Sequence, residues 1–227
     1  MLNASPDSHC IPLFWHTQLR DAALRFSTAY KKATGGRAIL IGGGATILLG
    51  QMARHTKDLD FNVSKMAPRD VKALNAAGIY VRRIGHTLDR FAATVPESEE
   101  DAKDAISIDL AVQRDINALI PFTREIEGVT VADERLLIVM KIQCLSERSV
   151  ASSKKVGSDF EDVMWCASRL HEENVQLPES LSKQLSEDVI RNFFEAVSRH
   201  SGGDREDVSM AKFFLKMAKI IPESFED

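Results

Sequence analysis

The stretch that decides the fold is residues 38–63, AILIGGGATILLGQMARHTKDLDFNV. It reads as a buried strand, a glycine turn, a short helix and a second strand that carries Asp58 and Asp60. Residues i and i+2 of a strand point to the same face, so the two carboxylates share one side of the expected sheet. Carboxylates held this close repel each other, and a shared cation commonly neutralises them.

The glycines Gly42 to Gly44 complete this pattern. Glycine lets the backbone approach a phosphate closely, and a helix that begins there offers N–H groups without an intrahelical partner. Mg²⁺ prefers hard oxygen ligands, commonly one or two carboxylates together with substrate phosphates. The stretch therefore predicts a site for a metal-bound nucleoside triphosphate. A lone run of three glycines is also typical of a plain strand-to-helix turn.

The composition is that of a globular protein with one or two domains. The chain has 227 residues, of which 44% are hydrophobic and 27% charged. No apolar run approaches the ~20 residues that span a bilayer, and the N-terminus lacks a secretory pattern. Cysteines are few and odd in number: Cys10, Cys144 and Cys166. We therefore expect a reducing, cytoplasmic location and no membrane contact.

The net charge of −4 argues against a large nonspecific nucleic-acid footprint, although it permits a local basic patch. Three basic pairs are candidates for such a patch: Lys31–Lys32, Arg82–Arg83 and Lys154–Lys155. The favoured interpretation of each is a solvated surface pair.

Hydrophobic periodicity divides the chain near Asp133. Strands are predicted at 38–41, 59–63, 79–81, 91–95, 106–112 and 129–131. Helices are predicted at 16–32, 45–52, 68–77, 134–148, 159–170, 181–200 and 208–219. The acidic stretch 96–104 is interpreted as an exposed loop. The fold class is therefore α+β, with a mixed sheet and flanking helices in a first domain, 1–132, and a helical second domain, 133–227.

A third carboxylate, Asp109, lies at the centre of the strand ISIDLAV, residues 106–112. A carboxylate in so apolar a strand needs a partner or a metal. Taken alone, a charge facing solvent on an edge strand is the commoner explanation. Taken with Asp58 and Asp60, Asp109 favours a metal site of three carboxylates.

The order of these motifs resembles the nucleotidyltransferase superfamily with the DNA polymerase β-type fold. The run Arg54-x-Thr56-x-Asp58-Leu59-Asp60-Phe61 is most similar to the AbiEii-like group of type IV toxins and its minimal nucleotidyltransferase relatives. A second set of residues extends the resemblance: Lys141, Arg148, Asp159 and Asp162. Together the motifs cover about residues 38–170.

This resemblance implies an enzyme that moves a nucleoside monophosphate from an NTP to a hydroxyl group with two Mg²⁺ ions. Asp58 and Asp60 would bridge both ions, and Asp109 would ligate the ion at the acceptor hydroxyl or take its proton. The nucleotide would be bound by Gly43, Gly44, Ala45, Thr46, Lys141 and Asp159. The acceptor stays open between an RNA 3′ end such as tRNA, a protein and a small molecule.

Several of these residues have structural alternatives. Lys141 is as compatible with a lysine snorkelling from a packed helix as with triphosphate binding. Arg54 is expected to pair with Asp58 or Asp60, and Thr56 to orient the turn before the strand. For Asp159 and its neighbour on the same helical face, Asp162, capping or ion pairing with Lys141 or Arg148 is favoured.

An alternative function belongs to another class: a catalytically inert nucleotide-binding or protein-interaction module of the same fold. It is motivated by the third glycine, which shifts the glycine register, and by Ser158, which stands where the similar group carries a basic residue. The presence of all three carboxylates argues against it.

Overall fold

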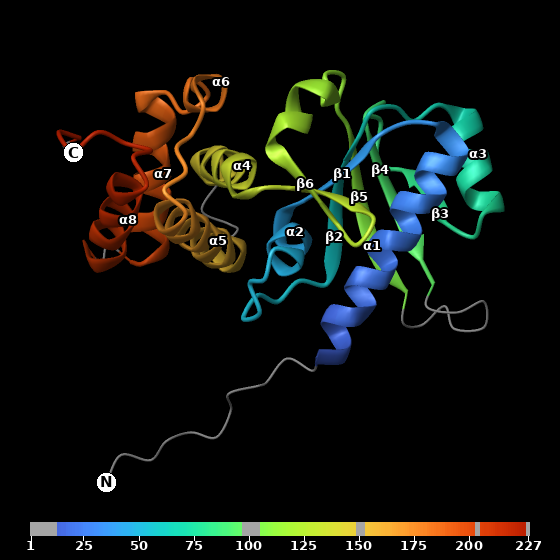
Figure 1. The fold of residues 1–227 in the computed structure, drawn as a ribbon, viewed down its shortest axis with the longest axis horizontal. Helices are drawn as coiled ribbons and strands as arrows, with labels where there is room; N and C mark the ends of the chain where they lie inside the picture. The colour runs from blue at the N-terminus through green and yellow to red at the C-terminus, as the bar shows by residue number, and fades with distance from the viewer. Residues whose placement is uncertain (1–12, 97–104, 149–152, 203–204, 226–227) are drawn as a thin grey trace, which may run out of the picture.

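The centre of the molecule is a seven-stranded mixed sheet with the order β3-β4-β5-β2-β1-β7-β6 (Figure 1). The computed structural model describes residues 13–96, 105–148, 153–202 and 205–225. The strands are β1 (Ala38–Ile41), β2 (Asp58–Val63), β3 (Tyr80–Arg83), β4 (Arg90–Val95), β5 (Ile106–Val112), β6 (Thr123–Ile126) and β7 (Val129–Ala132). Residues 97–104 of the predicted acidic loop lie outside the described residues.

The pairing places the two strands that carry aspartates side by side. β2 pairs in parallel with β5 and antiparallel with β1. β3, β4 and β5 form an antiparallel meander, while β1 and β7 are parallel and β6 returns antiparallel to β7. β2 and β5 therefore lie next to each other inside the sheet, with neighbours on both sides.

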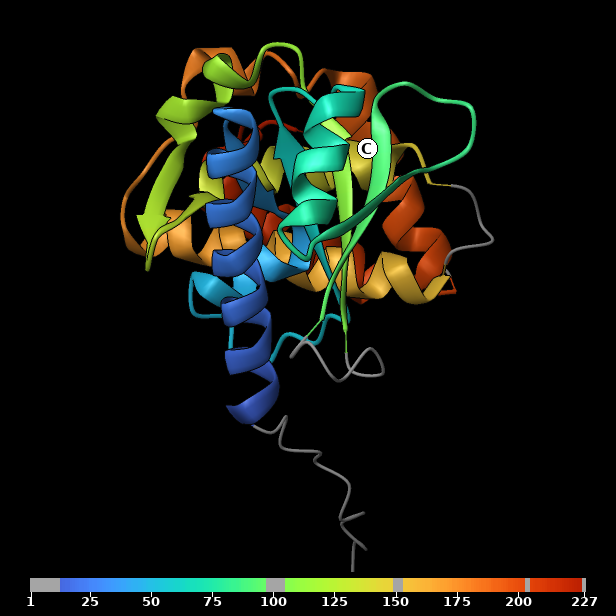
Figure 2. The ribbon, with the colours of Figure 1, turned by 90° about the vertical axis from the view of Figure 1, so that its right-hand side faces the viewer.

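Helices α1 (Leu13–Thr34) and α3 (Pro68–Ala76) cover one face of this sheet (Figure 2). The residues of α1 that face the sheet recur at helical spacing and are fully buried: Leu19, Ala23, Phe26 and Tyr30. The ring of Phe26 lies 4.7 Å from the ring of Phe61 on β2. Because side chains alternate along a strand, the residues on either side of Phe61 point to the opposite face.

The helices that follow the last strand in the chain form a group at one end of the sheet (Figure 1). They are α4 (Glu134–Ser146), α5 (Ser153–Glu172), α6 (Glu179–Ser182), α7 (Glu187–His200) and α8 (Arg205–Met217). α4 packs against α5 and α7 and also against α2 (Gly42–Leu48) and β7. It is apolar around most of its circumference, which is typical of a helix surrounded by protein.

α4 begins at the point where the sequence pattern changes. The Asp133 carboxylate accepts hydrogen bonds from the backbone N–H groups of Arg135, at 3.0 Å, and Leu136, at 3.3 Å. Such N-caps satisfy backbone donors that the first helical turn leaves free. The division into two domains at this residue stays a prediction.

The predicted α+β fold class is confirmed, and several elements differ from the prediction. α2 begins at Gly42 rather than at Ala45. The helix predicted at 181–200 is divided into α6 and α7, because Ser186 caps a new helix by accepting the N–H of Val189. The 3₁₀ helix η1 (Ile116–Phe122) and strand β6 were not predicted.

Within the described ranges, every helix is too short or too polar to cross a membrane.

Candidate functional site

Three carboxylates lie on the face of the sheet that α1 and α3 leave uncovered. Asp58 and Asp60 are two residues apart on β2, and Asp109 lies on β5 directly opposite Asp60 in the parallel pairing. Ser107 holds the same position opposite Asp58. The structure thus places the three predicted catalytic residues on two adjacent strands of one face.

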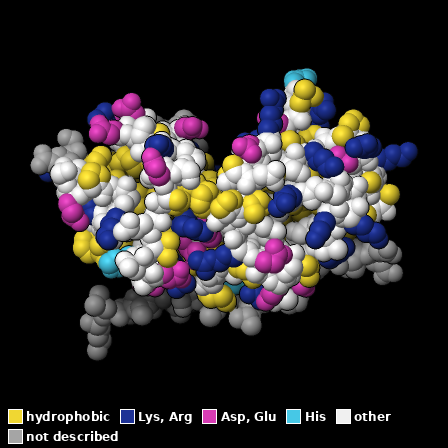
Figure 3. All heavy atoms as spheres, turned by 45° about the horizontal axis from the view of Figure 1, so that its top comes forward, with side chains coloured by type: hydrophobic (Ala, Val, Ile, Leu, Met, Phe, Trp, Pro, Cys, Tyr) yellow, Lys and Arg dark blue, Asp and Glu magenta, His cyan; other side chains and the backbone are white. Residues whose placement is uncertain are grey.

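These carboxylates line a cavity of about 680 Å³ between the sheet and the C-terminal helices. α4 contributes Leu137, Met140, Lys141 and Cys144, and α5 contributes Lys155, Ser158, Asp159 and Glu161. Acidic and basic side chains lie side by side where the sheet meets these helices (Figure 3). The volume is within the range of ~300–1,000 Å³ that small-molecule sites commonly have.

The negative charge of the three aspartates is only partly balanced. Burial, followed by the charges of Asp58 and Asp109, raises the pKa of Asp60 from 3.8 to about 6, although Lys141 and Lys155 act in the opposite direction. A carboxyl group whose ionised form is this unfavourable gains free energy from a nearby cation. The site therefore has the electrostatics of a cation site.

The residues present fit Mg²⁺ by donor chemistry and by charge, since three carboxylates offer the hard oxygens that this ion prefers. The fit is less complete in geometry. Among the residues that the structure describes, no three His, Cys, Asp or Glu side chains converge closely enough to hold a metal ion as they stand. The Asp58 carboxylate instead accepts a hydrogen bond of 2.9 Å from the Thr56 hydroxyl. This contact agrees with the predicted role of Thr56 in orienting the turn.

The glycine edge of the cavity consists of Gly42 and Gly43. Gly42 adopts a φ of +66°, and a Cβ at this position would lie 2.4 Å from Asp60 Oδ2. A Cβ on Gly43 would lie 2.9 Å from an Arg54 guanidinium nitrogen. Neither position has room for a side chain, so the backbone itself forms this wall of the cavity.

The next three residues, which were predicted to contact the nucleotide, do not line the cavity. Gly44 packs against Leu59, where a Cβ would lie 2.6 Å from Leu59 Cδ2. Ala45 and Thr46 are fully buried, and the Thr46 hydroxyl donates to the Gly43 carbonyl at 2.9 Å. The hydroxyl proposed for phosphate binding is thus used inside the helix. The reason is that α2 begins three residues earlier than the sequence pattern indicated.

An ion-pair network in the wall of the cavity joins α4 and α5. Lys141 Nζ lies 2.5 Å from Asp159 Oδ1 and 2.7 Å from Asp162 Oδ2, and Arg148 Nη2 lies 2.5 Å from Asp159 Oδ2. Burial lowers the pKa of Lys141, but Asp162 and Asp159 outweigh this effect, so the pKa is raised overall. The favoured ion-pair interpretation of Asp159 and Asp162 agrees with these contacts.

Arg54 joins this network instead of pairing with Asp58 or Asp60 as predicted. Its Nε donates to Asp162 Oδ1 at 2.9 Å, and its Nη1 donates to the His55 carbonyl. Asp162 is completely buried, so it requires cationic partners. The sequence gives no signal for this contact, because Arg54 and Asp162 are 108 positions apart. Lys57 and Met140, which also line the cavity, were missed as well.

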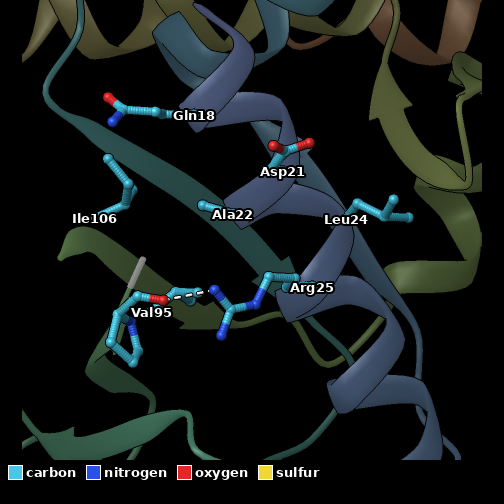
Figure 4. Close-up of a pocket in the computed structure, with 8 residues that line it drawn as sticks. Gln18, Asp21, Ala22, Leu24, Arg25, Val95 and Ile106 are labelled. Atoms are coloured by element: carbon cyan, nitrogen blue, oxygen red, sulfur yellow. Dashed lines mark hydrogen bonds between the residues drawn. The ribbon is translucent and has the colours of Figure 1, made fainter. Parts of the chain in front are cut away.

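A smaller cavity of about 240 Å³ lies between α1 and the ends of β4 and β5 (Figure 4). Arg25 crosses it and donates to the Pro96 carbonyl at 2.5 Å. Gln18 and Asp21 add polar groups, and apolar side chains form the rest of the lining. None of the predicted site residues lines this cavity.

Comparisons with known proteins give a fold and no family. The sequence matches no family model and no curated protein. Two solved structures from Helicobacter pylori are similar in fold. JHP933 has a TM-score of 0.55 and 18% identity, with 91% of this chain and 90% of JHP933 covered. A proposed nucleotidyltransferase has a TM-score of 0.54 and 18% identity, with 91% of this chain and 93% of that protein covered. The chain therefore shares the fold of these two proteins.

Proposed function

We propose that this protein is a Mg²⁺-dependent nucleotidyltransferase that moves a nucleoside monophosphate from an NTP to a hydroxyl group. The acceptor oxygen attacks the α-phosphorus, the bond between the α-phosphorus and the bridging oxygen of the β-phosphate breaks, and pyrophosphate leaves. The acceptor proton passes to a carboxylate or to water. No oxidant or further co-reactant is needed.

One observation carries the proposal: Asp58, Asp60 and Asp109 line one cavity from two adjacent strands, and basic residues line the opposite wall. Mg²⁺ bound by these carboxylates would neutralise charge on the triphosphate and lower the pKa of the attacking hydroxyl. Asp109 is exposed and pairs with Asp60 across the sheet. It is therefore placed to accept the proton of a hydroxyl that enters from solvent.

The triphosphate would lie between the glycine edge and the helices. At Gly42 and Gly43 the backbone itself forms the wall of the cavity, because a Cβ would collide with Asp60 at position 42 and with Arg54 at position 43. The buried network of Arg54, Lys141 and Arg148 with two aspartates carries a net charge of +1, from three cations and two anions. Lys57 and Lys155 add further positive charge to the lining.

The finer assignment to the AbiEii-like group is also a proposal. It is supported by the way residues that are distant in sequence meet. Arg54 of the first motif contacts Asp162 of the second, and Lys141 contacts both Asp159 and Asp162. A set of motif residues that act on one substrate is expected to meet in this manner.

The test is transfer of label from each of the four α-³²P-labelled NTPs, with Mg²⁺ and total RNA. Wild-type protein is compared with Asp58→Ala and Asp60→Ala. Asp115→Ala is the matched control, since Asp115 is exposed and lies outside the cavity. We expect label on RNA, on the protein or on a small molecule, lost in both site variants and kept in the control. Equal transfer in all four proteins would overturn the proposal.

The alternative is an inert nucleotide-binding module. One finding favours it: within the described residues, no three carboxylates lie close enough together to hold a metal ion. This alternative predicts NTP binding that depends on the cavity, with no pyrophosphate release over long incubation with varied acceptors. Release that depends on Asp58 and Asp60 would exclude it.

A further inference from the structure

The carboxylates are the inner end of two rows of residues that cross the sheet to its edge. In the first row, Asp60 is paired with Asp109, Asp109 with Ala92, and Ala92 with Arg82. In the second row, Asp58 is paired with Ser107, Ser107 with Thr94, and Thr94 with Tyr80. Paired residues point to the same face, so Arg82 and Tyr80 share the face of the aspartates.

This face is open from β5 to β3. Helices α1 and α3 pack on the opposite face, where the apolar residues Val81, Phe91 and Leu110 are buried. On the open face, Ser107, Asp109, Arg82 and Arg90 are exposed, and Tyr80 has 63% of its surface exposed. A large aromatic side chain this exposed buries little apolar surface, so it contributes little to the core.

The two arginines on this face, Arg82 and Arg90, form no ion pair with the part of the chain that the structure describes. By contrast, ion pairs are formed by Arg54, Arg124, Arg135, Arg148 and Arg169. The neighbouring Arg83 points to the other face, where its guanidinium lies 6.0 Å from the centre of the Phe91 ring. Arg82 and Arg83 are both exposed, as a solvated surface pair would be, and they lie on opposite faces of the sheet.

We propose that the open face of β3, β4 and β5, defined by Tyr80, Arg82, Arg90, Thr94 and Ser107, binds the acceptor as a single-stranded nucleic-acid 3′ end. This proposal rests on the proposed function, and it adds the acceptor subsite. Arg82 and Arg90 bind backbone phosphates, and Tyr80 stacks on a base. The terminal hydroxyl then lies at Asp109, beside the nucleotide cavity.

The geometry favours an extended polyanion. Neighbouring strands are about 4.8 Å apart, so Arg82 lies about 10 Å from Asp109 across two strand spacings. An extended chain of phosphates that ends at Asp109 covers this distance. Arginine next to an exposed aromatic ring is also the combination by which proteins bind single strands, through phosphate contacts and base stacking. An acidic peptide would use the arginines but not the stacking surface of Tyr80.

The test measures binding without NTP, so that no transfer takes place. The probe is a fluorescein-labelled single strand of about 12 nucleotides, prepared as RNA and as DNA, and the readout is fluorescence anisotropy over a salt series. The variants are Arg82→Glu, Arg90→Glu, Tyr80→Ala and Tyr80→Phe. Arg83→Glu is the matched control, since it makes the same charge change at the adjacent residue on the other face. Circular dichroism confirms that each variant is folded.

We expect Arg82→Glu and Arg90→Glu to weaken binding about tenfold or more. Each should also reduce the slope of log K against log salt by about 0.7 for every phosphate that the variant no longer binds. Tyr80→Ala should weaken binding about tenfold, and Tyr80→Phe should restore it, because stacking needs the ring and not the hydroxyl. Arg83→Glu should bind as wild type does. Comparison of the RNA and DNA probes shows which backbone is preferred.

The assignment is overturned by no binding of either probe, by unchanged binding in the Arg82 and Arg90 variants, or by an equal loss in Arg83→Glu. Binding of a glutamate-rich peptide in place of both oligonucleotides would point to a protein acceptor and would also overturn it. The proposed function fails separately, when label transfer does not depend on Asp58 and Asp60. Label on a protein or small molecule with no oligonucleotide binding leaves the proposed function standing and removes this acceptor site.

Discussion

A side chain at Gly42 would collide with the Asp60 carboxylate as it now lies. A Cβ there would lie 2.4 Å from Asp60 Oδ2, and the φ of +66° is one that residues other than glycine rarely adopt. The contact brings the end of β1 against the carboxylate of β2 and holds the glycine edge of the cavity beside the proposed metal site.

Gly42→Ala should therefore destabilise the fold by two separate effects, strain and collision, with a cost of about 2–4 kcal/mol. Gly85→Ala is the matched control. Gly85 has a similar φ of +60°, with no atom within 4 Å of the added Cβ, so strain alone should cost about 1 kcal/mol. Urea denaturation measures both. Equal losses in the two variants would show that the contact with Asp60 does not constrain the site.

Neutralising Asp60 should stabilise the metal-free protein at neutral pH. The pKa of Asp60 is raised from 3.8 to about 6, so the folded protein binds this proton more tightly than the unfolded chain does. Ionisation of Asp60 therefore lowers stability as pH rises from about 4 to 6, and the loss is complete above that window. Asp60→Asn should gain about 1–3 kcal/mol above the window and nothing below it.

Thermal unfolding of Asp60→Asn and wild type over a pH series measures this effect. Asp115→Asn provides the comparison, because Asp115 is exposed and lies outside the cavity. A gain that does not change with pH, or the same gain in Asp115→Asn, would argue against coupling among the three carboxylates.

Mg²⁺ should raise the midpoint of thermal unfolding of the wild type, because a ligand that binds only the folded state stabilises it. The rise should be smaller below pH 6, where Asp60 is protonated. It should be largely lost in Asp60→Asn and kept in Asp115→Asn. Differential scanning fluorimetry with and without Mg²⁺ measures the shift, and an equal rise in wild type and Asp60→Asn would contradict a metal site at Asp60.

Lys141→Met should be strongly destabilising, because it leaves Asp159 and Asp162 buried with one cation fewer. Removing one partner from a buried ion pair commonly costs about 3–5 kcal/mol. The exposed pair of Lys183 and Glu179 provides the control, since Lys183→Met should change stability by less than about 1 kcal/mol. Adding Asp162→Asn to Lys141→Met should recover part of the loss. If Lys141→Met unfolds at the same denaturant concentration as Lys183→Met, the network is not structural.

The sequence predicted the sheet strands that carry the carboxylates because their signal is local. Alternation along 106–112 and the two aspartates of 58–63 can be read without knowing their neighbours. Strand β6 was missed because its four residues, TREI, carry two charges and follow a proline-containing 3₁₀ helix. The start of α2 was missed because glycine is a poor helix former, so the pattern placed the first turn after the glycines.

Among the site residues, too, local patterns predicted some, and others depend on how distant parts of the chain pack. Asp58, Asp60 and Asp109 follow from spacing within strands, whereas the partner of Arg54 depends on how α5 packs beside the cavity. No local pattern distinguishes Asp162 from Asp58 as the carboxylate that Arg54 contacts. The strand predicted at 79–81 ends before Arg82, whereas β3 continues to Arg83. With the strand end at Arg83, the alternation of side chains would have predicted that Arg82 and Arg83 point to opposite faces.

The most direct test of the central claim is label transfer from α-³²P-labelled NTP by Asp109→Ala, with NTP binding measured on the same protein. Asp109 lies at the outer edge of the cavity, opposite Asp60 and away from the glycine edge. We expect the variant still to bind Mg²⁺ and NTP, because Asp58, Asp60 and the glycine edge remain, but to transfer no label. Transfer at the wild-type rate would contradict the claim that these three in-register carboxylates perform the reaction.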